Sequence, residues 1–259
     1  MQACENERVL GFRLFENPLY FAVVGTLCGA LGFRLGWRSG SRFALPLLQG
    51  LFGFFAFAIA WRVGGAIFGA LAVGGWAFGT TFYSIHLFKK ERDRIDERVL
   101  RARAYRESML AWLRGGRGPE SQPLITARTH LIELVFYLAA ATLSANLLSI
   151  VMGAILLDYM NAYVAVLSLS ARRKWTVRLL AWNSWSVVRV GAYIMLGSAC
   201  AAPLAAWFGY PASLTRVRWL LYMGGIGVVL DLVLKLLLSR SCGRLLAGAV
   251  ELGPSPDAT

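Results

Sequence analysis

The stretch of sequence that decides the fold is FALPLLQGLFGFFAFAIAW, residues 43–61, which contains no charged side chain. A run of about 20 apolar residues is long enough for an α-helix to cross the hydrocarbon core of a bilayer. Comparable apolar runs recur along the chain, and hydrophobic residues make up 57% of its 259 residues. Soluble domains contain roughly 45–50%. The sequence therefore predicts an all-α protein, a polytopic bundle of transmembrane helices.

The basic residues indicate membrane orientation rather than nucleic-acid binding. The formal net charge is +13, and Arg and Lys gather in short segments between the apolar runs. Such segments stay on the cytoplasmic side and attract anionic lipid headgroups. A nucleic-acid-binding face would need a soluble domain, which the sequence does not predict. We expect a bacterial-type inner membrane, with the bilayer and its anionic lipids as partners and no nucleic acid. A homo-oligomer or a partner in a membrane complex is left open.

The first half of the chain is predicted to cross the membrane three times within residues 18–88, after a short N-terminal segment of residues 1–17. The end of the first apolar run is basic, with Arg34, Arg38 and Arg42. A basic cluster of this kind belongs on the cytoplasmic side, so the N-terminus is predicted to lie outside.

Residues 89–128 form the main basic segment, which three spans would place in the cytoplasm. Proline and glycine are absent from Lys89 to Leu113, and the apolar side chains of this stretch fall on one helical stripe. We expect a single amphipathic helix here, able to continue the third span directly, and then a loop that begins at the glycines after Arg114.

The second half, residues 129–240, is predicted to contain four more spans. Residues 130–170 have basic flanks on both sides, so both flanks should be cytoplasmic. We therefore divide this stretch into two helices that turn near residues 149–153. Two further spans follow at about residues 179–208 and 217–238. The prediction is seven spans, or six if the division is wrong, with the C-terminus inside and residues 241–259 as a partly disordered cytoplasmic tail.

Small residues recur at four-residue spacing, which predicts closely packed helices. The pairs are Gly25 with Gly29 and Gly75 with Gly79, and residues 141–153 carry a similar stripe. Packing within the chain is the simpler interpretation, and a dimer face or a permeation groove is the alternative.

Two pairs of charged or polar residues fall inside predicted spans, where such residues are costly and mark functional sites by default. Asp231 and Lys235 are four residues apart, so they lie side by side on one helix. They form either a structural ion pair or a site that couples a proton or cation to transport. Asp158 and Asn161 share a helix face and either line a water-filled vestibule or cap a turn.

A basic and aromatic segment predicts an anionic headgroup site. Arginine binds phosphate through two hydrogen bonds, and tryptophan lies at headgroup depth. The alternative is an ordinary basic flank with an aromatic belt. The four residues have the spacing of one helical face: Arg178, Trp182, Trp185 and Arg189.

A metal site has only weak support. His86, His130 and Glu133 are predicted to lie at the same membrane level, and two imidazoles with a carboxylate are zinc ligands. Interfacial polar residues are the simpler interpretation. The cysteines are scattered without CxxC spacing, and no cofactor motif is present, so no cofactor is expected.

Three functional classes remain. The first is a carrier or channel for a small solute or lipid, with intramembrane charges in its pathway. The second is an accessory or scaffold subunit that docks through the basic helix of residues 89–113. The third is a membrane-embedded, lipid-modifying enzyme, which the absence of catalytic motifs makes the weakest of the three.

Overall fold

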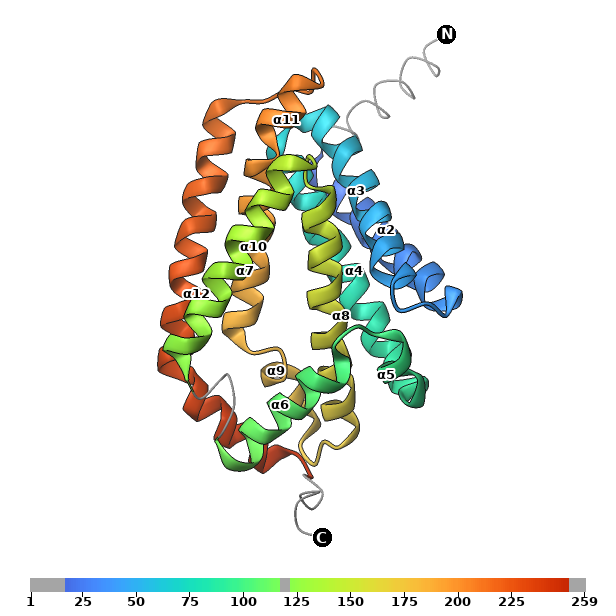
Figure 1. The fold of residues 1–259 in the computed structure, drawn as a ribbon, viewed down its shortest axis with the longest axis vertical. Helices are drawn as coiled ribbons and strands as arrows, with labels where there is room; N and C mark the ends of the chain where they lie inside the picture. Colours follow the sequence, from blue (N-terminus) through green and yellow to red (C-terminus); the bar gives the residue numbers. More distant parts are fainter. Residues whose placement is uncertain (1–16, 117–121, 252–259) are drawn as a thin grey trace, which may run out of the picture.

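The computed structural model describes residues 17–116 and 122–251, and its regular elements are all helices (Figure 1). This confirms the predicted all-α fold. Among the described residues, six helical stretches are long and apolar enough to cross a membrane, which is compatible with an integral membrane protein. They are α2 (Pro18–Ser39), α3 (Ala44–Gly64), α4 (Ala66–Lys90), α8 (Leu147–Leu169), the stretch Lys174–Trp207 and α12 (Leu214–Ala249).

The predicted division of residues 130–170 into two helices is present, but the turn comes earlier than expected. Helix α7 (Pro123–Leu143) is followed by α8, and the chain turns at residues 144–146 instead of 149–153. Ala145 and Asn146 have positive φ angles of 49° and 82°, a conformation that asparagine tolerates better than most residues. The 21-residue α7 is not among the six candidate spans, so seven spans stay a prediction.

Helices α2 and α4 pack with their backbones in direct contact, as the glycine spacing predicts. A methyl group at Gly25 would collide with the carbonyl oxygen of Ala72, and one at Gly75 would collide with the carbonyl oxygen of Ala22. Gly79 meets Thr26 in the same way. The glycines therefore serve packing inside the chain, and the close approach supplies the van der Waals contact that lipid does not drive.

The basic segment after α4 is divided, in contrast to the single helix expected there. It contains a 3-10 turn (Arg92–Arg94), α5 (Ile95–Arg98) and α6 (Ala102–Gly115), with Arg101 in the left-handed region at φ 63°. The reason is tertiary. Ile95 of α5 and the following Val99 pack beside Phe33 and Trp37 at the end of α2. Further along the segment, Met109, Trp112 and Leu113 of α6 belong to a second cluster, and α6 packs against α8 and α12. One straight helix does not reach both clusters.

The last third of the bundle departs from the predicted spans in two places. The expected span of residues 179–208 consists of α9 (Lys174–Leu180), α10 (Ser184–Cys200) and α11 (Ala202–Trp207). Helix α12 continues to Ala249, so residues 241–249 of the predicted tail are helical. Backbone hydrogen bonds from Arg172 to Ala249 and from Glu251 to Ser170 tie its end to the loop before α9, and residues 252–259 lie outside the described part.

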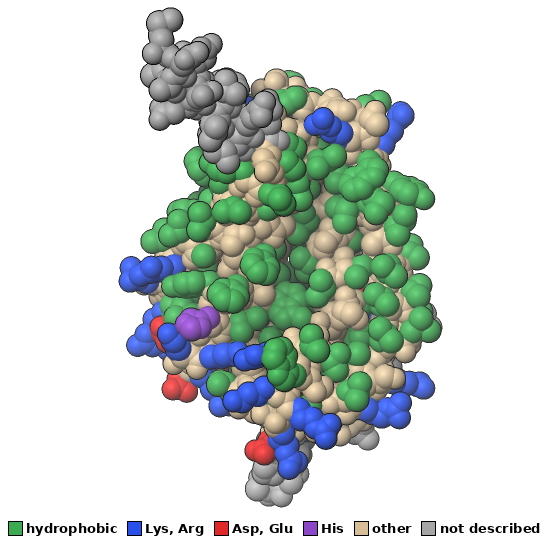
Figure 2. Space-filling model, turned by 180° about the vertical axis from the view of Figure 1, so that it is seen from behind, with side chains coloured by type: hydrophobic (Ala, Val, Ile, Leu, Met, Phe, Trp, Pro, Cys, Tyr) green, Lys and Arg blue, Asp and Glu red, His purple; other side chains and the backbone are tan. Residues whose placement is uncertain are grey.

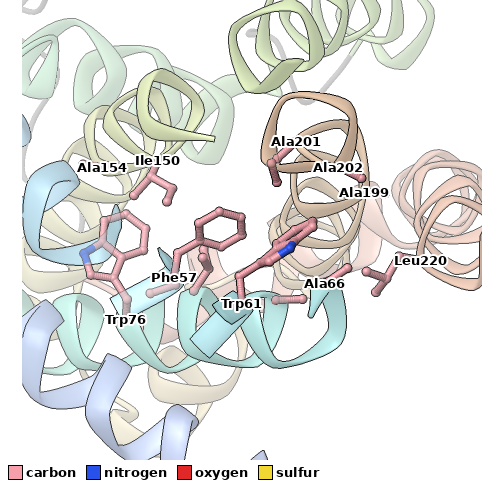
Figure 3. Close-up of a cluster of buried hydrophobic side chains, with 14 of the residues drawn as sticks. Phe57, Trp61, Ala66, Trp76, Ile150, Ala154, Ala199, Ala201, Ala202 and Leu220 are labelled. Atoms are coloured by element: carbon pink, nitrogen blue, oxygen red, sulfur yellow. The ribbon is translucent and has the colours of Figure 1, made fainter. Parts of the chain in front are cut away.

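The core and the surface match a helical bundle in lipid. Phe57, Trp61 and Trp76 of α3 and α4 point toward Ile150 of α8 and the alanines of α10 and α11 (Figure 3). On the face shown in Figure 2, apolar side chains cover the middle, and most of the Lys and Arg side chains lie toward the lower end, where Figure 1 shows α6 and the end of α12. This asymmetry supports the predicted orientation, which stays a prediction.

Candidate functional site

A cavity of about 190 Å³ lies between α7, α8 and α10. Its lining combines three tyrosines with an arginine and a carboxylate on an otherwise apolar wall: Arg101, Glu133, Tyr137, Met152, Ile155, Leu156, Tyr159 and Tyr193. A smaller cavity of about 40 Å³ shares Tyr137, Leu156 and Tyr193 and extends to Trp76. Ligand sites are typically concave and apolar with a few polar groups, so this is the leading candidate site.

The tyrosines of the cavity are held in place by defined contacts. The rings of Tyr137 and Tyr193 lie 5.1 Å apart, and the Tyr193 hydroxyl donates to the carbonyl oxygen of His130 at 3.3 Å. Tyr159 packs against Tyr105 of α6 at 4.6 Å. The cavity wall is therefore built by α7, α8 and α10 with Arg101, and α6 supports it through the contact of Tyr105 with Tyr159. No sequence pattern indicates the cavity, because these tyrosines lie far apart in the chain.

Arg101 and Glu133 bring charge to the cavity. Nδ1 of His130 lies 3.1 Å from Oε2 of Glu133. Arg101 lies between α5 and α6 in a left-handed conformation, which costs a non-glycine residue of order 1 kcal/mol, and strained residues of this kind cluster at functional sites. The break in the basic segment thus places Arg101 beside Glu133 in the cavity lining.

Asp231 is paired with Arg189, which the sequence indicated as a headgroup ligand and not as a partner of Asp231. Arg189 of α10 donates from Nε to Oδ2 at 2.9 Å and from Nη2 to Oδ1 at 3.0 Å. Both side chains are largely buried, at 16% and 4% exposure. The expected partner, Lys235, is 1% exposed and lies one turn further along α12. The fork of a guanidinium matches both carboxylate oxygens, which explains why Arg189 takes this position.

Asp158 and Asn161 lie on the side of α8 that faces α3 and α4. The Gln49 side chain donates from Nε2 to Oδ2 of Asp158 at 2.8 Å, and both side chains are buried. Asn161 has a longer contact of 3.5 Å with the hydroxyl of Thr81. These residues are inside the bundle, away from the turn before α8, so the predicted turn-capping role is wrong.

The predicted headgroup face of Arg178, Trp182, Trp185 and Arg189 does not exist as one helical face. The helix breaks between Leu180 and Ser184, so the regular spacing no longer aligns these side chains. Arg178 stacks over Trp175, Trp185 is fully buried in the core, and Arg189 is bound to Asp231. Asn183 occupies the N-cap position of α10, with an extended ψ of 132° that interrupts the helical backbone.

A different cavity gathers arginines at the lower end of the bundle. Its volume is about 480 Å³, and it lies between the end of α6 and the last turns of α12. Figure 1 shows these two segments at the lower end of the bundle. Arg114, Arg240 and Arg244 line it together with Trp112 and Ser239. These residues combine the cationic and aromatic groups that the sequence led us to expect elsewhere.

The described residues contain no group of three or more His, Cys, Asp and Glu side chains that could hold a metal ion. His130 and Glu133 meet, but exposed His86 does not join them in such a group. The three residues that the sequence places at one level are therefore not assembled into a ligand set.

No protein-family model, no curated protein and no solved structure matches the chain, so its function is inferred from geometry.

Proposed function

We propose that the protein is a membrane carrier for a small solute or lipid that binds in the cavity between α7, α8 and α10. The observation that carries the proposal is this cavity itself, because it joins tyrosine hydroxyls, Arg101 and Glu133 to an apolar wall inside a bundle of membrane-length helices. Polar groups at that depth are costly unless they serve a ligand or one another.

The buried ion pair supports this function by fixing the cavity wall. Arg189 and Tyr193 are four residues apart on α10, so they lie on the same face. The bond from Arg189 to Asp231 therefore sets the position of α10 against α12 and, with it, the position of Tyr193 in the cavity. A charge-compensated carboxylate fits this positioning role better than the exchange of a proton.

The scaffold function has less support. The apolar face of α6 is occupied inside the molecule, where Met109, Trp112 and Leu113 are buried. On its polar side, Arg106 pairs with Asp96 and Arg103 pairs with Glu107. A partner would meet only the charged outer surface of α6, and such surface ion pairs contribute little to affinity.

Cysteine accessibility tests the carrier proposal without knowledge of the solute. In a background where the four native cysteines are replaced by serine, Met152→Cys places a thiol in the cavity. Phe78→Cys is the matched control, since Phe78 is 66% exposed in the middle of α4 and should face lipid. A membrane-impermeant thiol reagent should modify the cavity cysteine and spare the control.

A carrier opens its site to each side in turn, so Met152→Cys should react in right-side-out and in inverted vesicles. Solutes that bind should slow this reaction and should be taken up by proteoliposomes. If the cavity cysteine is unreactive from both sides in folded protein, water does not reach the cavity and the carrier proposal is wrong.

A further inference from the structure

The pair formed by Gln49 and Asp158 has an unusual hydrogen-bond balance. The two side chains are 0% and 2% exposed, and one bond joins them, from Nε2 of Gln49 to Oδ2 of Asp158. The second oxygen of each group, Oε1 of Gln49 and Oδ1 of Asp158, is buried without a donor. The two side chains are already in contact, and each has one acceptor oxygen that lacks a hydrogen-bond donor.

The carboxyl group of Asp158 also has no cation to balance a negative charge, since none of the ion pairs within the described residues includes it. Transfer of an unpaired ionised carboxylate from water to an apolar interior is strongly unfavourable, and such a group takes up a proton instead.

The elements packed around α8 supply no charge on the Asp158 side. In α3, the charged residue is Arg62, 13 positions after Gln49. Helix α4 contributes the neutral Thr80 and Thr81 on this side. Its titratable residues lie nearer its C-terminal end: Tyr83, His86, Lys89 and Lys90. Glu133 and Tyr137 of α7, Tyr193 of α10 and Arg101 line the cavity with Tyr159, on a different face of α8 from Asp158. Tyr105 of α6 also meets Tyr159 and Tyr163, and α9 carries Lys174 and exposed Arg178.

We propose that Asp158 and Gln49 form a proton-binding site. In this site, Oδ1 of Asp158 is protonated, and its O–H group donates a hydrogen bond to Oε1 of Gln49. Together with the bond from Nε2 to Oδ2, this closes a ring of two hydrogen bonds between a carboxylic acid and an amide. One O–H bond forms at Oδ1 and none breaks in the protein, because the proton comes from water. A single proton satisfies both oxygens and removes the buried charge.

Trp76 connects this site to the cavity. Its indole Nε1 donates to the backbone carbonyl oxygen of Gln49 at 3.0 Å, while its ring forms part of the wall of the smaller cavity. The indole thereby fixes the backbone that presents the Gln49 amide to Asp158. The proton site is independent of the carrier proposal, because it depends only on the groups at the interface of α3, α4 and α8.

Infrared spectroscopy of the purified full chain at neutral pH tests the site directly. A protonated carboxyl gives a C=O stretching band that ionised carboxylates lack and that shifts in D₂O. We expect such a band in the wild type, its loss in Asp158→Asn and its retention in Asp96→Asn, a control whose carboxylate is bound to Arg106 at the surface. The asparagine side chain still pairs with Gln49, so the variant should fold.

A second variant keeps the test decisive if Asp158→Asn does not fold. Gln49→Leu removes the oxygen that accepts the hydrogen bond from the Asp158 carboxyl group. The C=O stretching band should therefore move to higher frequency while Asp158 stays protonated. The proposal is wrong if the carboxyl band of the wild type is changed by neither Asp158→Asn nor Gln49→Leu. A gain of thermal stability with Na⁺ over choline that disappears in Asp158→Asn would also overturn it, because a cation would then occupy the site.

Discussion

Arg189 and Asp231 form a two-bond ion pair that joins α10 to α12 across 42 positions of sequence, with donor–acceptor distances of 2.9 and 3.0 Å. Both side chains are largely buried, and each belongs to a different candidate span. In this setting, each charge depends on the other, because both side chains are largely buried.

Removal of one charge of this pair should therefore cost more than removal of both. Asp231→Asn leaves the guanidinium of Arg189 with a neutral amide, and we expect the free energy of unfolding to fall by about 3–5 kcal/mol. The double variant Arg189→Met with Asp231→Leu should regain most of that loss. Thermal unfolding in detergent, followed by size-exclusion chromatography, measures both. Equal losses in the single and the double variant would contradict the dependence of each charge on the other.

The glycines between α2 and α4 give a sharply controlled prediction. Gly75→Ala forces a methyl group against the carbonyl oxygen of Ala22, and overpacking of this kind costs about 1–3 kcal/mol. The adjacent Gly74→Ala meets nothing within 4 Å and should stabilise the helix by about 0.5–1 kcal/mol. Unfolding midpoints of the two variants should move in opposite directions. A shift of the same sign in both would mean that the close contact of α2 and α4 does not form.

Anionic lipid should bind at the arginine cavity near the end of α12. Arg240→Gln with Arg244→Gln removes two of its cations, and we expect several-fold less anionic phospholipid to copurify, measured by native mass spectrometry. The control, Arg172→Gln with Arg173→Gln, lowers the net charge equally at exposed positions outside the cavity. Equal loss of lipid in both variants would show attraction to the overall charge rather than a site.

The orientation can be tested at two positions of one end of the bundle. The loop before α9 is bonded to the end of α12, so residues 171–173 and 250 lie together. An epitope tag inserted after Lys174 and one after Arg114 should both be reached by antibody only in inverted or permeabilised cells. External detection of the first tag alone would mean that residues 130–170 cross the membrane once, and α7 would not be a span.

Local features of the sequence were sufficient for much of the fold. Apolar runs predicted the helices, and the spacing of four glycines predicted a close helix contact: Gly25, Gly29, Gly75 and Gly79. Both predictions were possible because hydrophobicity and side-chain size are properties of the individual residue. The cost of a buried charge is also a property of one residue and its flanks. Asp231 and Asp158 could therefore be singled out before any partner was known.

The tertiary structure alone decided which groups those charges meet and where the helices break. Asp231 binds Arg189 and Asp158 binds Gln49, across 42 and 109 positions, and no periodicity connects residues so far apart. The break around Arg101 has the same origin, since the apolar side chains before it and those after it pack on different neighbours. The cavity tyrosines come together for this reason too. Hydrogen bonding and packing act between neighbours in space, whereas a sequence pattern records only neighbours along the chain.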